Sequence, residues 1–394
     1  MPLVNRLPGT SDKDTLEIKS RRSIEEHIQG LLSTYDYSVI ETPVIEYTDL
    51  FLRKSGGELA SRLYSFQDPG GKHVSLRPEF TSSCIRYFIE NQKDLEVPLR
   101  VQYSGPVFRY NPGIGYTEAY QIGAELIGAE SADSDGEILA IALEGSEHFK
   151  GGDIQCRVGH IGILSQILSD VGVTQRGQNF LISNLHLLGD MEQGENTILE
   201  QAKTVGLILT EETEDDFITS IRDMDESKAL SLLSDLFKDS LTDPLGNRSS
   251  DEILTRFISK YSKVEEYNAF IAGIDILNRL IETNGEYSNA MPDLKILLSA
   301  NNIDEAVLNP LTDIIQNLKQ RIPGARIIVD LSLVRGIAYY TGMVFEIYDQ
   351  VGDKSMVICG GGRYDGLVKA LGGNQDVPAL GFAYSLANLS GATS

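Results

Sequence analysis

The sequence of 394 residues contains no tryptophan, only five histidines and only three cysteines. The cysteines, Cys84, Cys156 and Cys359, are odd in number and form no C-x-x-C pair, which argues against a disulfide framework and against a zinc ribbon. No apolar run is long enough to span a bilayer, and the first residues lack the apolar core of a secretory signal. We therefore expect a cytoplasmic protein without a membrane partner.

Basic residues are also scarce, because 34 Lys and Arg stand against 57 Asp and Glu, a formal net charge of −23. No block of five basic residues is present, so we expect no nucleic-acid partner. The acidic excess is concentrated in residues 211–240, which hold ten acidic and three basic side chains. Such a segment is typical of a solvated helical surface, although a docking surface is also compatible with it.

Common catalytic motifs are missing as well. The sequence has no G-x-x-x-x-G-K-[ST] phosphate loop, no H-E-x-x-H and no G-x-S-x-G, and the histidines are scattered without the spacing of metal ligands. The run Gly360-Gly361-Gly362 does not open a long helix and predicts a turn rather than a dinucleotide site. We predict that the chain needs no cofactor and binds no metal ion.

What the sequence does contain is an α+β pattern interrupted by a helical one. Helical spacing covers Thr15 to Tyr35 and Asp135 to Lys150, and residues 99–129 predict an antiparallel hairpin with a long Gly/Pro connection open to a ligand. Strand signals recur at 155–160, 327–330, 343–348 and 356–358. We predict a core formed by residues 1–170 and 322–394, with a mainly helical acidic insertion over 171–321.

Charged and aromatic residues gather on the strand-like segments. Gln121 and Glu125 are an even number of residues apart, so on a strand they share one face, and Gly123 between them leaves room for a pocket. Taken one at a time, Arg109, Glu125 and Arg335 could each be part of an ordinary surface salt bridge. Only a pattern that includes all of these residues together distinguishes a ligand-binding pocket from separate surface salt bridges.

That pattern resembles the catalytic core of class II aminoacyl-tRNA synthetases, and of the histidyl-tRNA synthetase family in particular. The matching segments, in chain order, are Glu41-Thr42-Pro43, the R-P-E-x-T box at Arg77 to Thr81, Phe108-Arg109, the L-V-R-G-x-x-Y-Y signature at Leu333 to Tyr340, and Gly361 to Leu367. The resemblance implies an antiparallel sheet flanked by helices, and dimers formed through the first motif.

The resemblance also implies a site for free histidine. Arg109 and Arg335 would face the carboxylate, because a planar guanidinium makes charge-assisted pairs with it. Glu79, Thr81 and Gln121 would receive the ammonium group. Glu125 and Tyr340 would hydrogen-bond the two imidazole nitrogens, with Tyr339 packed nearby. This histidine site therefore comprises Glu79, Thr81, Arg109, Gln121, Glu125, Arg335, Tyr339 and Tyr340, and none of these residues is assigned a catalytic role.

The sequence departs from the synthetase pattern where ATP would bind. The acid after F-R-x is Asn111, the loop arginine is Thr117, and the third motif has Ala387 and Asn388 in place of an acid and an arginine. Neutral side chains cannot stabilise the charge that develops on a phosphate. Ala338 replaces the aspartate of the histidine signature, and the chain ends at Ser394, so we expect no anticodon-binding domain.

These features resemble the family of ATP phosphoribosyltransferase regulatory subunits, which are paralogues of histidyl-tRNA synthetase. The resemblance implies a non-catalytic subunit in the first step of histidine biosynthesis, one that activates the short-form catalytic subunit and transmits feedback inhibition by L-histidine. It also implies a hetero-octamer with four copies of each chain. Two alternatives stay open: a reduced synthetase-like enzyme that forms an aminoacyl adenylate, and a histidine-binding scaffold with another partner.

Overall fold

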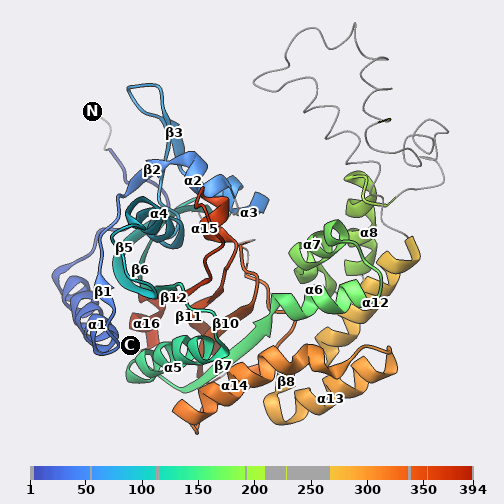
Figure 1. The fold of residues 1–394 in the computed structure, drawn as a ribbon. Coiled ribbons are helices and arrows are strands. Elements are labelled where there is room, and N and C mark those ends of the chain that lie inside the picture. Colours follow the sequence, from blue (N-terminus) through green and yellow to red (C-terminus); the bar gives the residue numbers. More distant parts are fainter. Residues whose placement is uncertain are drawn as a thin grey trace, which may run out of the picture. The chain divides into compact units, whose positions relative to one another are not determined.

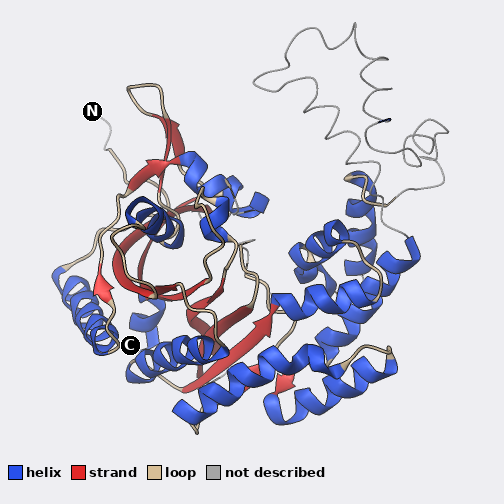
Figure 2. Ribbon diagram, in the orientation of Figure 1, coloured by secondary structure: helices blue, strands red, loops and turns tan. Residues whose placement is uncertain are grey.

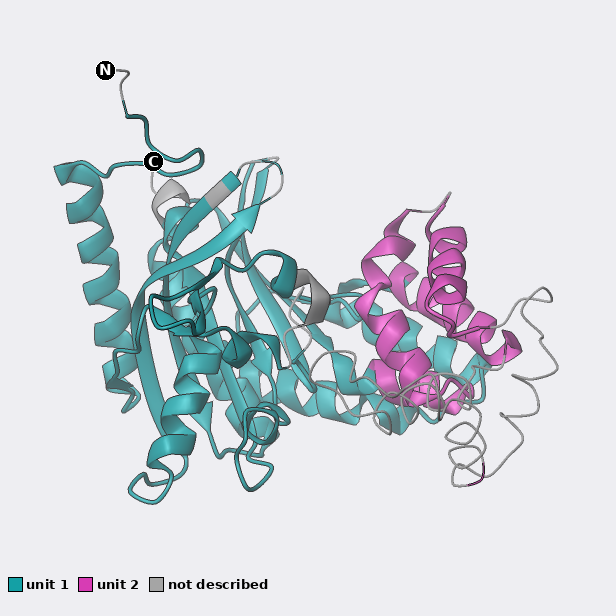
Figure 3. Ribbon diagram, turned by 90° about the horizontal axis from the view of Figure 1, so that it is seen from above, with its two compact units in different colours: residues 1–163, 283–394 teal, residues 164–282 magenta. Residues whose placement is uncertain are grey.

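The computed structural model of the chain describes residues 4–53, 56–111, 113, 115–190, 193–208, 228, 267–335, 339–352 and 354–392 (Figure 1). The described chain divides into two compact units, residues 1–163 with 283–394 and residues 164–282, which Figure 3 shows in two colours. The acidic segment 211–240 lies outside the described residues except for Lys228. The predicted domain boundaries at 171 and 321 stay a prediction.

The first unit is formed around a nine-stranded sheet with the order β1-β5-β6-β12-β11-β10-β7-β9-β8. Most neighbouring strands are antiparallel, and only the β1–β5 and β7–β9 pairs are parallel. The strands of this sheet are β1 (Ser38–Val39), β5 (Leu99–Asn111), β6 (Gly115–Ile127), β7 (Asp153–His160), β8 (Gly285–Glu286), β9 (Ile327–Val329), β10 (Met343–Val351), β11 (Lys354–Arg363) and β12 (Ala379–Ser385).

One face of the sheet is covered by α5 (Ala132–His148), which packs against β7, β10, β11 and β12 (Figure 2). The helix begins at Ser131, whose hydroxyl accepts a hydrogen bond from the Ser134 amide. Tyr384 of β12 reaches this helix and donates to the Ala142 carbonyl at 2.8 Å. On the outer side of α5, Gly136 allows α14 (Asn309–Arg321) to pack closely, since a side chain there would lie 2.6 Å from Asn317 Cβ.

Further helices complete the first unit. α1 (Thr15–Thr34) begins with a capping box between Asp14 and Glu17 and buries Ile24, Ile28 and Leu32. The helix α16 (Leu386–Ala392) contacts α1 and β6. The remaining helices of this unit are α2 (Thr48–Leu52), α3 (Gly56–Ser61), α4 (Thr81–Asn91), α13 (Tyr287–Ala300), the 3-10 turn η3 (Glu305–Leu308) and α15 (Leu367–Ala370).

A three-stranded sheet, β2-β4-β3, belongs to the same unit and consists of β2 (Ile45–Tyr47), β3 (Ser65–Gln67) and β4 (His73–Leu76). Arg77 directly follows β4 and is 3% exposed. Its guanidinium donates to the Thr42 carbonyl at 2.7 Å and to the Pro106 carbonyl at 2.9 Å, and it lies over the Phe80 ring. Arg77 thus joins the segment before β2, the strand β5 and the start of α4.

The second unit is helical in its described part. It contains most of α6 (Ile161–Asp170), α7 (Gln175–Ser183), the 3-10 turn η1 (Leu185–Gly189), α8 (Gly194–Thr204) and α12 (Tyr267–Glu282). Gly273 of α12 permits close packing, since a side chain there would lie 2.8 Å from Val173 and 3.1 Å from Leu181. Phe270, Ile274 and Leu277 are fully buried along the same helix.

The predicted fold class is confirmed as a large central sheet flanked by helices. Two local predictions are wrong. The connection after β5 is short, because the strands end at Asn111 and resume at Gly115. Residues 360–362 form no turn, because β11 runs through all three glycines to Arg363.

Candidate functional site

The first unit contains a cavity of about 260 Å³ above the centre of the large sheet. Seven of the eight predicted histidine-site residues line it, namely Glu79, Thr81, Arg109, Gln121, Arg335, Tyr339 and Tyr340. The eighth, Glu125, lies against the lining side chains rather than on the cavity wall. Segments far apart in the sequence thus meet at one place, while the role of each residue stays a prediction.

The floor of the cavity includes residues with little or no side chain, namely Gly360, Gly381 and Ala383. Register pairs Gly360 of β11 with Ala383 of β12, and Ala383 with Gly123 of β6. Directly paired residues of antiparallel strands place their side chains on the same face. Glycine and alanine in the middle of central strands therefore leave space above the sheet that larger side chains would otherwise fill.

Polar groups from neighbouring segments lie directly over these glycines. A Cβ atom at Gly360 would be 1.4 Å from Arg335 Nη1, and one at Gly381 would be 1.8 Å from Glu125 Oε2. At Gly123 it would be 2.5 Å from the Tyr103 hydroxyl. Each glycine is required because a polar group lies flat against the sheet at that position.

Glu125 is the centre of a buried hydroxyl cluster. It is 1% exposed and accepts hydrogen bonds from Thr81 Oγ1 at 2.7 Å, from the Tyr103 hydroxyl at 3.1 Å and from the Tyr364 hydroxyl. Burial raises the pKa of Glu125 to about 8, against the opposing effect of these hydrogen bonds. The carboxyl group can therefore hold or release a proton near neutral pH, which suits a titratable ring such as imidazole.

Charges of both signs lie at another part of the lining. Glu79 accepts hydrogen bonds from the Ser82 amide at the start of α4, and burial raises the pKa of this carboxyl group despite those bonds and nearby Arg109. Arg109 donates from Nε to the Pro78 carbonyl at 2.8 Å, and burial lowers its pKa. Arg335 Nη1 pairs with Glu346 at 3.0 Å. This arrangement can bind an ammonium and a carboxylate group together.

Tyrosine rings form the apolar part of the wall. The ring of Tyr339 lies 5.0 Å from that of Tyr340 and 5.5 Å from that of Tyr364, measured between centroids. These rings pack into a buried cluster with Ile85, Phe88 and other apolar residues. A flat polar ring could stack or hydrogen-bond here at small entropic cost, because the surrounding rings are already fixed.

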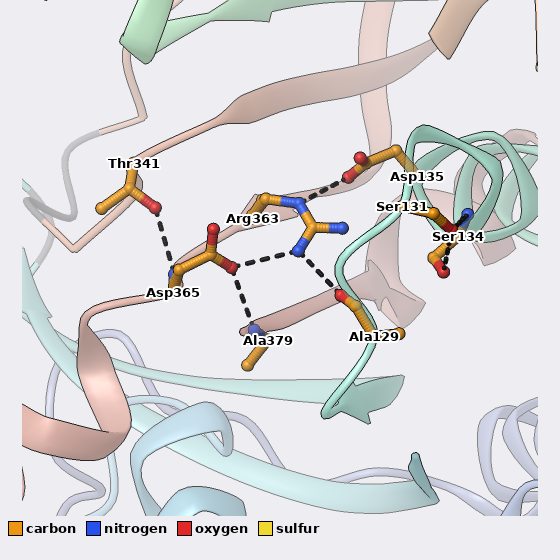
Figure 4. Close-up of polar contacts among 8 residues, drawn as sticks. All are labelled: Ala129, Ser131, Ser134, Asp135, Thr341, Arg363, Asp365 and Ala379. Atoms are coloured by element: carbon orange, nitrogen blue, oxygen red, sulfur yellow. Dashed lines mark hydrogen bonds and ion pairs between the residues drawn. The ribbon is translucent and has the colours of Figure 1, made fainter. Parts of the chain in front are cut away.

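The position of Tyr364 is fixed by its two neighbours. Arg363 donates to Asp135 at 3.0 Å, to the Ala129 carbonyl at 2.9 Å and to Asp365 at 3.1 Å. Asp365 in turn accepts from the Ala379 amide, and its own amide donates to Thr341, as Figure 4 shows. These contacts hold the end of β11 in one conformation, so that the Tyr364 hydroxyl reaches Glu125.

Four polar side chains of the cavity lining were not predicted from the sequence as site residues. Tyr103, Arg62 and Glu346 line the cavity with Tyr364. Tyr364 lies inside the segment Gly361 to Leu367, which matches the family pattern, so the resemblance could have identified it as a site residue. Tyr103 pairs in register with Gly123, which no sequence pattern reveals.

The neutral residues that replace the expected ATP contacts use their polar atoms elsewhere. Thr117 Oγ1 donates to the Arg109 carbonyl at 2.7 Å, and Asn388 Nδ2 donates to the Val357 carbonyl at 2.6 Å. Ala338 lies outside the described residues. Within the described ranges, no three His, Cys, Asp or Glu side chains are grouped to hold a metal ion. No helix in the described part of the chain has the length and apolar character needed to cross a membrane.

The chain is similar to known proteins over almost its whole length. A sequence profile of the family described as histidyl-tRNA synthetase matches residues 9–197 and 254–389. The chain belongs to this family. Histidine–tRNA ligases of Methanocaldococcus jannaschii and Methanococcus vannielii are 31% and 29% identical to it, over 95% of this chain and 72% and 73% of theirs.

A solved structure from Bacillus halodurans shares the fold. It is named as an ATP phosphoribosyltransferase regulatory subunit/histidyl-tRNA synthetase, and matches 100% of this chain and 84% of its own with a TM-score of 0.66. Because only 22% of the residues are identical, this likeness supports the fold alone.

The family relationship corrects one expectation from the sequence. We expected a chain without enzymatic activity, but the curated relatives that match 95% of it are named histidine–tRNA ligase, which is an enzyme. The neutral side chains at Thr117 and Asn388 do not by themselves exclude an enzyme, because the similarity extends over 95% of the chain. The expected catalytic partner, the hetero-octamer and the cytoplasmic location stay predictions.

Proposed function

We propose that the cavity binds free L-histidine. The observation that carries this proposal is a cavity of about 260 Å³ whose lining provides charges for a zwitterion and, separately, the hydroxyl groups that surround Glu125. Arg335 lies over β11, and the hydroxyl of Tyr103 lies over β6, two strands away across β12. Two strand spacings amount to about 10 Å, which gives a small amino acid room to place its two polar ends apart.

In this proposal each end of the ligand has its own partners. The carboxylate pairs with Arg109 and Arg335, and the ammonium group pairs with Glu79, Thr81 and Gln121. The imidazole ring lies between Tyr339, Tyr340 and the cluster centred on Glu125, and it accepts or donates hydrogen bonds at both nitrogens. A ring without two polar atoms would bury itself against this polar cluster without making hydrogen bonds to it, which disfavours other amino acids.

We further propose that the chain uses this site to activate histidine, as a reduced synthetase-like enzyme in which the histidine carboxylate attacks the α-phosphate of ATP, forming an aminoacyl adenylate and releasing pyrophosphate. Membership of the family and the names of the curated relatives support this activity. Arg109 and Arg335 would then stabilise the charge that develops between the carboxylate and the α-phosphate.

A second candidate is a regulatory role for the same site. In this proposal histidine controls a short-form phosphoribosyltransferase partner, as the name of the Bacillus halodurans structure suggests for that protein. The neutral side chains at Thr117 and Asn388 favour this candidate, because they supply no charge for a triphosphate. A ligand can regulate a partner only if its affinity differs between the two states of the complex.

Calorimetry with L-histidine tests the binding proposal. Wild type should bind, and Arg335→Ala or Glu125→Ala should weaken binding by at least about tenfold. Arg335→Ala removes a charge-assisted hydrogen bond to the carboxylate, and Glu125→Ala removes the centre of the cluster that meets the imidazole ring. Arg326→Ala is the control, since Arg326 is exposed and pairs with Glu286 away from the cavity. Equal affinities in all four proteins would refute the assigned site.

Histidine-dependent ATP–pyrophosphate exchange separates the two candidate roles. A signal that Arg335→Ala abolishes supports activation of histidine. If exchange is absent, co-expression with a short-form phosphoribosyltransferase tests the second candidate by complex formation and by inhibition with histidine. Absence of both results would leave histidine binding without either role.

A further inference from the structure

Arg335 occupies an unusual place for a charged side chain. Its guanidinium lies across β11 at Gly360, where any larger residue would collide with Nη1. Arg109 lines the same cavity, and its pKa is lowered first by burial and in part by the positive charge of Arg335, so the two guanidinium groups repel each other. An unsupported arginine would therefore move away from Arg109 toward solvent.

Glu346 of β10 provides that support. In register it lies between Gly360 of β11 and Arg157 of β7, so its side chain shares the cavity face of the sheet. Its Oε1 accepts from Arg335 Nη1 at 3.0 Å, and the Phe345 carbonyl lies 3.4 Å from the same nitrogen. Both contacts use Nη1, and among the residues that the structure describes the opposite edge of the guanidinium makes no hydrogen bond or ion pair, so that this edge can meet a ligand.

Glu346 is itself held by a second row of side chains. The Tyr348 hydroxyl donates to Glu346 Oε2, and Arg157 lies over the Tyr348 ring at 4.6 Å. Arg157 also pairs with Asp330 at 3.5 Å, and Asp330 accepts from Asn284 at 2.7 Å. The carboxylate of Glu346 therefore has one oxygen committed to Tyr348 and the other to Arg335.

We propose that Glu346 is a positioning residue that aims the free edge of Arg335 at the carboxylate of the bound amino acid, with Tyr348 fixing the orientation of Glu346. This inference rests on the proposed binding of histidine. In this proposal Glu346 acts through Arg335, which it holds in place beside Arg109. Arginine pairs with a carboxylate through two parallel hydrogen bonds, so a small rotation of the guanidinium costs affinity.

The test compares two ligands that differ in the carboxylate alone. Calorimetry is carried out with L-histidine and with L-histidinol, in which a hydroxymethyl group replaces the carboxylate. Wild type should prefer histidine. Glu346→Gln should weaken histidine binding by about tenfold or more, the factor expected for one charge-assisted hydrogen bond, and leave histidinol affinity within about twofold. Tyr348→Phe should show the same selective loss to a smaller extent.

Glu286→Gln is the matched control, because Glu286 pairs with Arg326 at 3.3 Å away from the cavity, and it should change neither affinity. Binding of histidinol by Glu346→Gln demonstrates that the variant is folded. Equal losses of both ligands would assign Glu346 a general structural role and overturn the inference, as would no loss of either. If wild type binds neither ligand, the proposed function itself fails.

Discussion

At the scale of single residues, the protonation of Glu125 gives the protein a pH-dependent stability. Burial raises its pKa to about 8 in the folded chain, whereas an unfolded glutamate titrates near 4.5. The folded state therefore holds the proton more tightly, and this contribution to stability is complete below pH 4.5 and is lost as the pH rises toward 8. We expect the free energy of unfolding to fall over this window by up to about 1.4 kcal/mol per pH unit.

Glu125→Gln removes this titration, so urea unfolding midpoints of the two proteins should diverge between pH 5.5 and pH 7.5. Wild type should lose stability relative to the variant as the pH rises. The difference between the two proteins isolates Glu125 from other titrating groups such as Glu79. Parallel curves over this range would contradict a raised pKa of Glu125 in the folded state.

The residue scale also shows what sequence reasoning can reach. The even spacing of Gln121 and Glu125 around Gly123 predicted a shared face, and in the structure all three lie on β6. The hydrogen-bond partners of Glu125 could not be predicted from the sequence, because Tyr103 and Tyr364 come from β5 and from the end of β11. Which hydroxyl groups converge on a carboxylate depends on strand register, and no local pattern in the sequence determines it.

At the scale of elements, Arg77 connects separate segments of the first unit and does not line the cavity. Its two hydrogen bonds to the Thr42 and Pro106 carbonyls join β4, β5 and the segment before β2. Lysine carries the charge but not the planar fork, so Arg77→Lys leaves at least one of these buried carbonyls unpaired. We expect a loss of about 2–3 kcal/mol in the free energy of unfolding, measured by chemical denaturation.

Arg53→Lys is the matched control. Arg53 is exposed and pairs with Asp49 one helical turn earlier, and such surface pairs contribute less than about 1 kcal/mol. An Arg77→Lys protein as stable as this control would show that the two hydrogen bonds of Arg77 to the Thr42 and Pro106 carbonyls do not contribute to stability. The folded Arg77→Lys protein should still bind histidine, since Arg77 does not line the cavity.

Elements were predicted best where one local pattern determines them. The helical spacing of apolar residues in Thr15 to Tyr35 and the two strand-like segments in residues 99–129 correspond to α1, β5 and β6. The three glycines at 360–362 predict a turn, because glycine is usually unfavourable inside a strand. In the structure these glycines lie within a strand because tertiary packing requires them: Arg335 and Tyr340 pack against the backbone at Gly360 and Gly362.

At the scale of the whole molecule, all residues assigned to histidine binding belong to one compact unit. The cavity lining and Glu125 fall within residues 1–163 and 283–394, and none falls within 164–282. We expect a chain in which residues 164–282 are replaced by a flexible Gly/Ser linker of about 20 residues to bind L-histidine within about threefold of the full chain. Calorimetry on both proteins measures the ratio.

Thermodynamic linkage provides the second readout. Histidine at one hundred times its dissociation constant should raise the free energy of unfolding by about 2.7 kcal/mol in both proteins, because a ligand that binds only the folded state stabilises it. At the same histidine concentration, the same replacement in an Arg335→Ala background should reduce this increase to about 1.4 kcal/mol or less, because affinity falls by at least about tenfold. A shortened chain with an intact circular dichroism spectrum but no response to histidine would mean that residues 164–282 take part in the site. Histidine recognition would then depend on both units, and its restriction to the sheet-containing unit would be wrong.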